Sequence, residues 1–154
     1  MKRRNILRVL LACVAMIASS VMPVNAASTQ NEYICLEDMA CELVEPSDLG
    51  CWKTSIIPQS QGQIDENFPA HSLCPMDSSI SLAVNDIITF NCSYSPSSAS
   101  LDFGVIASNN KFYSINVKGG SINQTLGINE AGSYRVAIRN NSSQTVRVVG
   151  FVNY

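Results

Sequence analysis

Short apolar runs with alternating polar positions recur along the chain from residue 63 to its end. Every second side chain of a strand lies on the same face, so Ile88, Phe90 and Cys92 predict a strand with one buried side. Clusters of Asn, Gly, Ser and Pro separate the runs, as is typical of turns. The runs that fit are 63–68, 79–84, 87–92, 101–106, 112–117, 121–128, 134–139 and 145–154.

No helical period lies between these runs, and parallel strands need long crossover connections. Antiparallel pairing is therefore favoured. The pattern predicts an all-β fold, an antiparallel and jelly-roll-like β-sandwich of about eight strands, over residues 61–154.

Residues 27–60 lack this alternation. The stretch is acidic, contains Cys35, Cys41 and Cys51, and has turn-forming residues at 46–48 and 50. We interpret it as an irregular, disulfide-stapled extension followed by a linker into the sandwich. A discrete binding motif is the alternative.

Residues 1–26 have the pattern of a secretion signal. Four basic residues lie within the first eight positions, an apolar run extends from 9 to 24, and Ala26 and Ala27 offer a cleavage site. The alternatives are an uncleaved anchor, whose apolar core is short for the ~20 residues of a spanning helix, and lipid attachment at Cys13. The pattern predicts a secreted protein, with attachment to the cell surface as the variant.

Charge changes the set of expected partners. Cleavage after residue 26 removes four basic residues and leaves six basic and twelve acidic ones, a net charge of −6. An acidic protein without a basic patch repels phosphate backbones, so we expect no nucleic-acid partner. No apolar run after residue 26 is long enough to span a bilayer, so we expect no membrane association after cleavage.

Five cysteines remain after cleavage, and in an oxidising compartment they are disulfide candidates. They are Cys35, Cys41, Cys51, Cys74 and Cys92. Two bridges and one leftover thiol allow fifteen arrangements, between which the sequence does not decide. No CxxC pair is present and His71 is the single histidine, so we expect no metal and no cofactor. Asp102 alone does not supply the six to eight oxygens of a calcium site.

Several segments carry a resemblance to a known group of proteins: Cys92–Pro96, Leu101–Ile106, Gly132–Ser142 and Val149–Tyr154. From about residue 55 onward the chain resembles small exported β-sandwich proteins of Gram-positive, clostridial-type bacteria. It is more distantly similar to bacterial pre-peptidase C-terminal domains and related jelly-roll modules. The resemblance implies a bacterial, exported module that assists targeting or binding. The cysteine-rich part departs from that pattern.

No catalytic set stands out. His71 and Ser72 lie in a predicted loop without a Gly-x-Ser-x-Gly motif, and Cys74 is expected in a disulfide instead of a pair with His71. Asp65 and Glu66 are adjacent, so in a strand they face opposite ways and do not form a carboxylate pair. We therefore expect no enzyme activity.

Aromatic residues are the candidate binding residues, because amphipathic rings stack on sugar rings and peptide side chains. They are Trp52, Tyr94, Phe112 and Tyr113; the alternative for one of the last two is a place in the core. The sequence favours an exported, non-enzymatic binding or interaction module for a protein or glycan surface. Two alternatives stay open: a carbohydrate-binding domain using Trp52 and Tyr113, and a secreted effector or toxin-like protein acting through residues 35–51.

Overall fold

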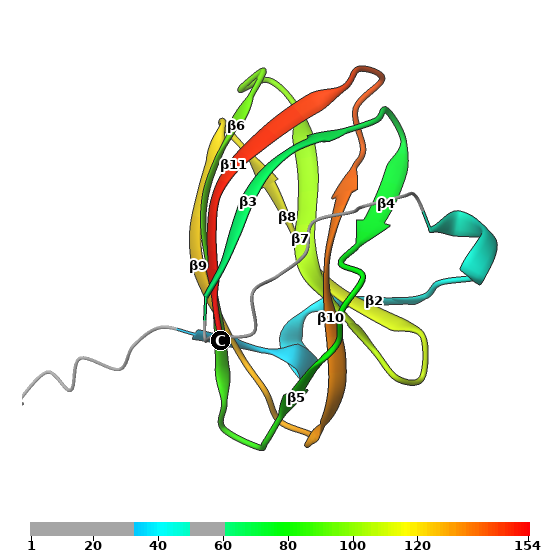
Figure 1. Cartoon of the computed structure of the whole chain (residues 1–154), viewed down its shortest axis with the longest axis vertical. Coiled ribbons are helices and arrows are strands. Elements are labelled where there is room, and N and C mark those ends of the chain that lie inside the picture. Colours follow the sequence, from blue (N-terminus) through cyan, green and yellow to red (C-terminus); the bar gives the residue numbers. More distant parts are fainter. Residues whose placement is uncertain (1–32, 50–60) are drawn as a thin grey trace, which may run out of the picture. The chain divides into compact units, whose positions relative to one another are not determined.

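The computed structural model of the protein describes residues 33–49 and 61–154. These residues form two sheets packed against each other, and the predicted all-β sandwich is confirmed (Figure 1). The predicted signal peptide, Cys13, Cys51 and Trp52 lie outside the described residues.

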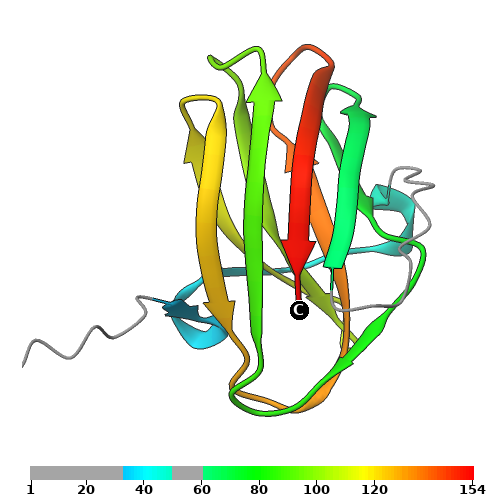
Figure 2. The same ribbon diagram turned by 60° about the vertical axis from the view of Figure 1, so that its left-hand side comes forward.

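Sheet A consists of five strands in the spatial order β1-β9-β6-β11-β3. Figure 2 shows β9, β6, β11 and β3 side by side. Their bounds are β1 (Tyr33–Cys35), β9 (Ser121–Gly127), β6 (Ile87–Ser95), β11 (Val146–Asn153) and β3 (Gln61–Phe68). All neighbours pair antiparallel except β1, which runs parallel to β9.

Sheet B has the order β2-β8-β7-β10-β4, and a further short strand, β5, also pairs with β10. Its strands are β2 (Ala40–Leu43), β8 (Lys111–Lys118), β7 (Ser100–Ala107), β10 (Gly132–Asn140), β4 (Ser72–Pro75) and β5 (Ile80–Leu82). All these pairs are antiparallel.

The core lies between the sheets and follows from the alternation in the sequence. In β6 the side chains of Ile88, Phe90, Cys92 and Tyr94 are buried, while those between them face outward. The rings of Phe90 and Phe103 meet edge to face across the two sheets, with centroids 5.6 Å apart. Such contacts between facing strands hold the two layers together.

Residues 33–49, which we call the strap, belong to the sandwich. β1 joins sheet A, the 3₁₀ turn η1 (Leu36–Asp38) follows, and β2 joins sheet B. Leu36 and Met39 are buried in the core cluster between the sheets. The sequence interpretation of residues 27–60 as an irregular extension did not anticipate these strands, because each is only three or four residues long.

The end of the strap covers the outer face of sheet B. After the turn η2 (Pro46–Asp48), Leu49 forms a bridge to Leu73 of β4. Val44 and Leu49 pack against a second apolar cluster on this face, which consists of Leu73, Ile106, Phe112 and Ala137. The short strand β4, which the alternation did not predict, lies beside this cover.

No disulfide joins the four described cysteines, so the predicted bridges are not seen among them. Cys92 points into the core from sheet A and Cys74 from sheet B. Cys35 is half-buried on β1, and Cys41 is exposed on β2. Burial raises the pKa of the Cys92 thiol to about 11, so it stays protonated at neutral pH.

Within residues 33–49 and 61–154, no helix is long and apolar enough to cross a membrane.

Candidate functional site

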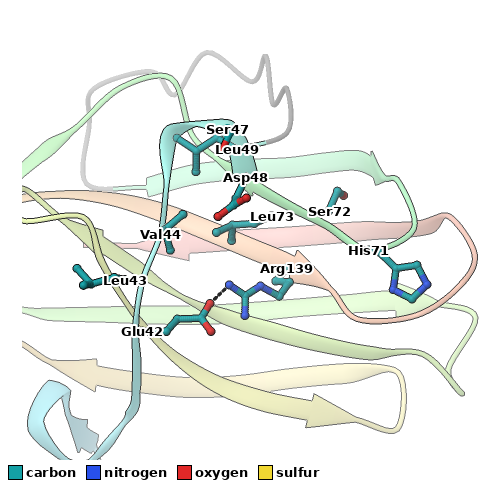
Figure 3. Close-up of a pocket in the computed structure, with 10 residues that line it drawn as sticks. All are labelled: Glu42, Leu43, Val44, Ser47, Asp48, Leu49, His71, Ser72, Leu73 and Arg139. Carbon is teal, nitrogen blue, oxygen red and sulfur yellow. Dashed lines mark ion pairs between the residues drawn. The ribbon is translucent and has the colours of Figure 1, made fainter.

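A pocket of about 630 Å³ lies where the strap crosses sheet B (Figure 3). It contains charged, hydroxyl and imidazole groups and is therefore the first candidate for a reactive site. Its lining includes Glu42, Asp48, His71, Ser72 and Arg139.

The charged groups of this pocket are engaged in holding the strap. The Arg139 guanidinium forms an ion pair with Glu42 of β2 and lies 3.8 Å from the Asp102 carboxylate. It also stacks 5.1 Å from the centroid of the Phe112 ring, and burial lowers its pKa from the usual value. Asp48 accepts a hydrogen bond from the Glu45 N–H at 3.3 Å, which caps η2.

The histidine and serine in this pocket serve the turn that precedes β4. The Ser72 hydroxyl donates to the Pro69 carbonyl at 2.7 Å, and the His71 N–H donates to the Ser142 carbonyl at 3.2 Å. His71 has a φ of +51° and is exposed at the margin of the pocket (Figure 3). The Ser72 proton is thus directed to a backbone carbonyl, which is the role of a turn residue.

The outer face of sheet A has a different character. Between β6 and β9, three pairs of like residues lie directly opposite each other: Thr89 with Thr125, Asn91 with Asn123, and Ser93 with Ser121. The two threonine hydroxyls are 2.9 Å apart. The asparagines and serines are exposed. The pairs form a ladder of hydroxyl and amide groups across two strands.

Apolar side chains flank this ladder. Of the six large hydrophobic residues that are clearly exposed in the described part of the chain, four lie here: Tyr33 on β1, Ile87 on β6, and Val149 and Phe151 on β11. Phe151 lies opposite Asn91 and is 44% exposed, and Val149 lies opposite Ser93. We call the ladder with these four residues the sheet A face.

Tyr33 forms one end of the sheet A face because a glycine lies beneath its ring. A Cβ on Gly127 would come within 2.6 Å of Tyr33 Cε2, so a larger residue would displace the ring. Tyr33 is 50% exposed. With Ile34, Ile87, Thr89 and neighbouring residues of β9, it lines a groove of about 640 Å³.

The centre of the sheet A face is uncharged. Where the paired rows continue from the ladder onto β11 and β3, the outer face carries two charged residues, Arg147 and Asp65, and their charges neutralise each other. Arg147 donates to both oxygens of the Asp65 carboxylate, from Nε at 3.0 Å and from Nη2 at 3.1 Å. Such exposed pairs contribute little to stability, but they remove net charge from the margin of the face.

The sequence-predicted binding residues do not gather at this site. Tyr94 and Phe112 are buried, 6% and 0% exposed, so neither ring presents a face to solvent in this structure. Phe112 lies on the outer face of sheet B beneath the strap. Tyr113 is half-buried against the core, and Trp52 lies outside the described residues.

One described group has the composition of a metal site. The ligand atoms of Cys35, Glu37 and Asp38 lie within 4.8 Å of one another. Glu37 already accepts a hydrogen bond from the Asn129 amide at 3.4 Å. Asp102 faces the Asn116 amide, which donates to it at 2.6 Å, and the Arg139 guanidinium, so its surroundings disfavour a cation.

Comparison of the chain with protein-family models, with curated proteins and with solved structures gave no match. The arguments for function therefore come from the molecule's own surfaces.

Sequence reasoning missed the sheet A face because its members are far apart in the chain. Asn91 and Asn123 sit in strand runs that were interpreted for their apolar faces. A signal was nevertheless present: residues at 89, 91 and 93 and residues at 121, 123 and 125 repeat Ser, Asn and Thr in reverse order. Antiparallel pairing brings such mirrored triplets together.

Proposed function

We propose that the chain is an exported binding module and that the sheet A face binds an uncharged glycan. The observation that carries this proposal is the ladder of paired hydroxyl and amide groups flanked by the exposed rings of Tyr33 and Phe151. Export is supported by the signal-like residues 1–26.

The chemistry of the face suits sugar rings. Amide and hydroxyl side chains both donate and accept hydrogen bonds, as sugar hydroxyls do. Exposed aromatic rings offer the apolar surface on which the C–H side of a sugar stacks. The paired rows of the ladder are two residues apart along the strands, or about 6.7 Å, and neighbouring strands lie about 4.8 Å apart, so the face offers hydrogen-bonding groups at several points along an extended glycan.

Charge selects among glycans. The ladder carries no ionised group, and the mature chain has the net charge of −6 that follows from its composition. Such a protein repels sulfated or carboxylated glycans at low ionic strength. An uncharged polysaccharide is therefore the favoured ligand class.

The alternative of an effector acting through the cysteine-rich segment gains no support from the described part of that segment. Leu36, Met39 and Val44 are buried and hold the strap to the sandwich. The strap instead contributes Tyr33 to the sheet A face.

The test is affinity electrophoresis of the mature protein in gels that contain neutral or anionic polysaccharides. We expect retardation by at least one neutral glycan, and loss of most of it in Tyr33→Ala and Phe151→Ala. Val84→Ala is the matched control, since Val84 is 50% exposed but lies outside this face. Migration unchanged by every neutral glycan would refute the proposal, and so would hydrolysis of the glycan.

A further inference from the structure

The two sheet edges beside the strap are only partly covered. β1 pairs with residues Thr125–Gly127 of β9, and β2 pairs with residues Lys111–Ser114 of β8. Among the described residues, no strand pairs with the outer side of 121–124 or of 115–118. Unpaired strand edges present backbone N–H and C=O groups to any extended chain that fits them.

The edge strands β3 and β4 carry features that block the addition of a further strand. β3 carries Asp65 and Glu66 and is followed by Pro69. β4 ends in Pro75 and forms a bridge to the strap at Leu73. Charges, prolines and covering segments are the devices by which proteins block strand addition. The edge at 121–124 reads Ser-Ile-Asn-Gln and has neither a charge nor a proline.

A groove of about 590 Å³ runs along this unguarded edge. Its apolar lining comes from both sheets and from the strap, and its larger members are Ile34, Met39, Ile115, Val117 and Ile122. Ile122 faces the same side as the core, whereas Asn123 faces outward. A strand added beside β9 would therefore place alternate side chains in the groove and leave the others in solvent.

One end of the groove is acidic. Asp38 lines it, and the neighbouring Glu37 is exposed in the same 3₁₀ turn. A basic residue at the corresponding end of an added strand meets opposite charge there.

We propose that the free edge of β9 binds a short extended peptide by strand addition. The peptide has apolar residues at alternate positions and a basic residue that lies next to Asp38. Four residues of free edge correspond to about 13 Å of strand. This binding site adjoins the glycan site, since Ser121 and Asn123 belong to both, but its floor is the groove between the sheets and not the outer face of sheet A.

The experiment uses the mature protein and a capped hexapeptide, Lys-Val-Ser-Val-Thr-Val. The control peptide has the same composition with its three valines together, which destroys the alternation. We expect the alternating peptide to bind at least about tenfold more tightly in titration calorimetry. We also expect it to slow hydrogen exchange at those amides of residues 121–124 that point away from β6, toward the free edge.

Two variants locate the site. Val117→Lys places a charge in the groove and is expected to weaken peptide binding about tenfold or more. Val84→Lys is the matched control and leaves binding unchanged. If Val117→Lys does not fold, Asp38→Asn serves instead, because it changes the charge of an exposed side chain and keeps its size. The natural protein should prefer the lysine peptide over the same peptide with glutamate in place of lysine, and Asp38→Asn should lose this preference.

Three results would overturn the proposal. Equal binding of both peptides means that strand alternation is not recognised. Protection of the edge-facing amides of residues 121–124 without peptide means that the edge is already occupied, by another segment of the same chain or by a second copy, which sedimentation distinguishes. Peptide binding that leaves the exchange of these edge-facing amides unchanged places the peptide elsewhere.

Discussion

The outer faces of both sheets carry apolar side chains, but the strap covers those of sheet B and leaves those of sheet A exposed. On sheet B, Ile106 and Phe112 point outward from the strands and are nevertheless buried, because Val44 and Leu49 of the strap cover them. On sheet A, Val149 and Phe151 also point outward and stay exposed. The strap reaches sheet A only at its edge, through β1.

Because of this difference, we expect outward-facing apolar residues to serve stability on sheet B and binding on sheet A. An apolar residue beneath the strap is part of a second core, and its burial contributes to folding. An apolar residue on the sheet A face leaves surface exposed that folding does not use. Clusters of exposed apolar groups among polar ones are typical of interaction sites. Substitutions of similar chemistry on the two faces should therefore have different effects.

The largest contrast is expected at the two phenylalanines. Phe112→Ala removes a fully buried ring and the contact of Arg139 with it, and should lower the free energy of unfolding by about 3–5 kcal/mol. Phe151→Ala should lower it by about 1 kcal/mol or less, because the ring is half-exposed. Urea unfolding followed by far-ultraviolet circular dichroism measures both. Equal losses would mean that the strap does not cover sheet B in solution.

The second prediction compares the buried thiol of Cys92, which points from sheet A into the core, with the same group in the unfolded chain. The pKa of Cys92 is about 11 in the folded protein against an ordinary value of 9.0, so the folded state holds this proton more tightly than the unfolded state does. Below pH 9 the thiol is protonated in both states and the free energy of unfolding keeps its full value. As the pH rises from 9 toward 11, the free energy of unfolding falls by up to about 2–3 kcal/mol. Burial also raises the pKa values of Tyr134 and Tyr154, which act in the same direction.

The Cys92→Ala variant isolates the thiol from the tyrosines. We expect its unfolding free energy to fall less steeply than that of the natural protein between pH 9 and pH 11. Folded protein treated with a thiol reagent at pH 8 should be modified at the exposed Cys41 and not at Cys92. Rapid labelling of Cys92 would contradict its burial.

The strands of the sandwich were predictable because their signal is local. Ile88, Phe90 and Cys92 alternate within one run, and the structure buries that side of β6. Asn140 lies between the predicted strands 134–139 and 145–154, yet its buried amide donates to the carbonyls of Phe68, Pro69 and Gln144. Those partners are brought together by the fold, and no local pattern indicates them.

The strap and the sheet A face could not be predicted from local sequence patterns, because both depend on contacts between residues far apart in the chain. Strand β1 has three residues, and its position depends on the Tyr33 ring lying over Gly127, about ninety positions away. Phe112 and Tyr113 are both aromatic, so alternation alone did not decide which is core. The cover provided by Val44 and Leu49 makes the outward-facing Phe112 the more buried of the two.

A third contrast compares two arginines. Arg139→Ala removes the ion pair with Glu42 and uncovers the Phe112 ring, so we expect a loss of about 1–2 kcal/mol. Arg147→Ala breaks the exposed pair with Asp65 on sheet A and should cost less than about 1 kcal/mol. Thermal unfolding at low and at 1 M salt measures both losses. High salt should reduce the difference between Arg147→Ala and the natural protein more than it reduces the Arg139→Ala loss, because exposed pairs are screened more strongly.

The smallest effect is expected for Val149→Thr, a change of nearly constant shape in the middle of β11. Its neighbour Val148 points into the core and is fully buried, while Val149 points to solvent beside Ser93. A hydroxyl at position 149 stays hydrated, and threonine keeps the strand preference of valine, so stability should change by less than about 0.5 kcal/mol. Val148→Thr is the matched control and should cost about 1–3 kcal/mol, since its hydroxyl enters an apolar core. A loss at Val149 as large as that at Val148 would mean that something covers the sheet A face, and the face would then be part of a second core, as the outer face of sheet B is.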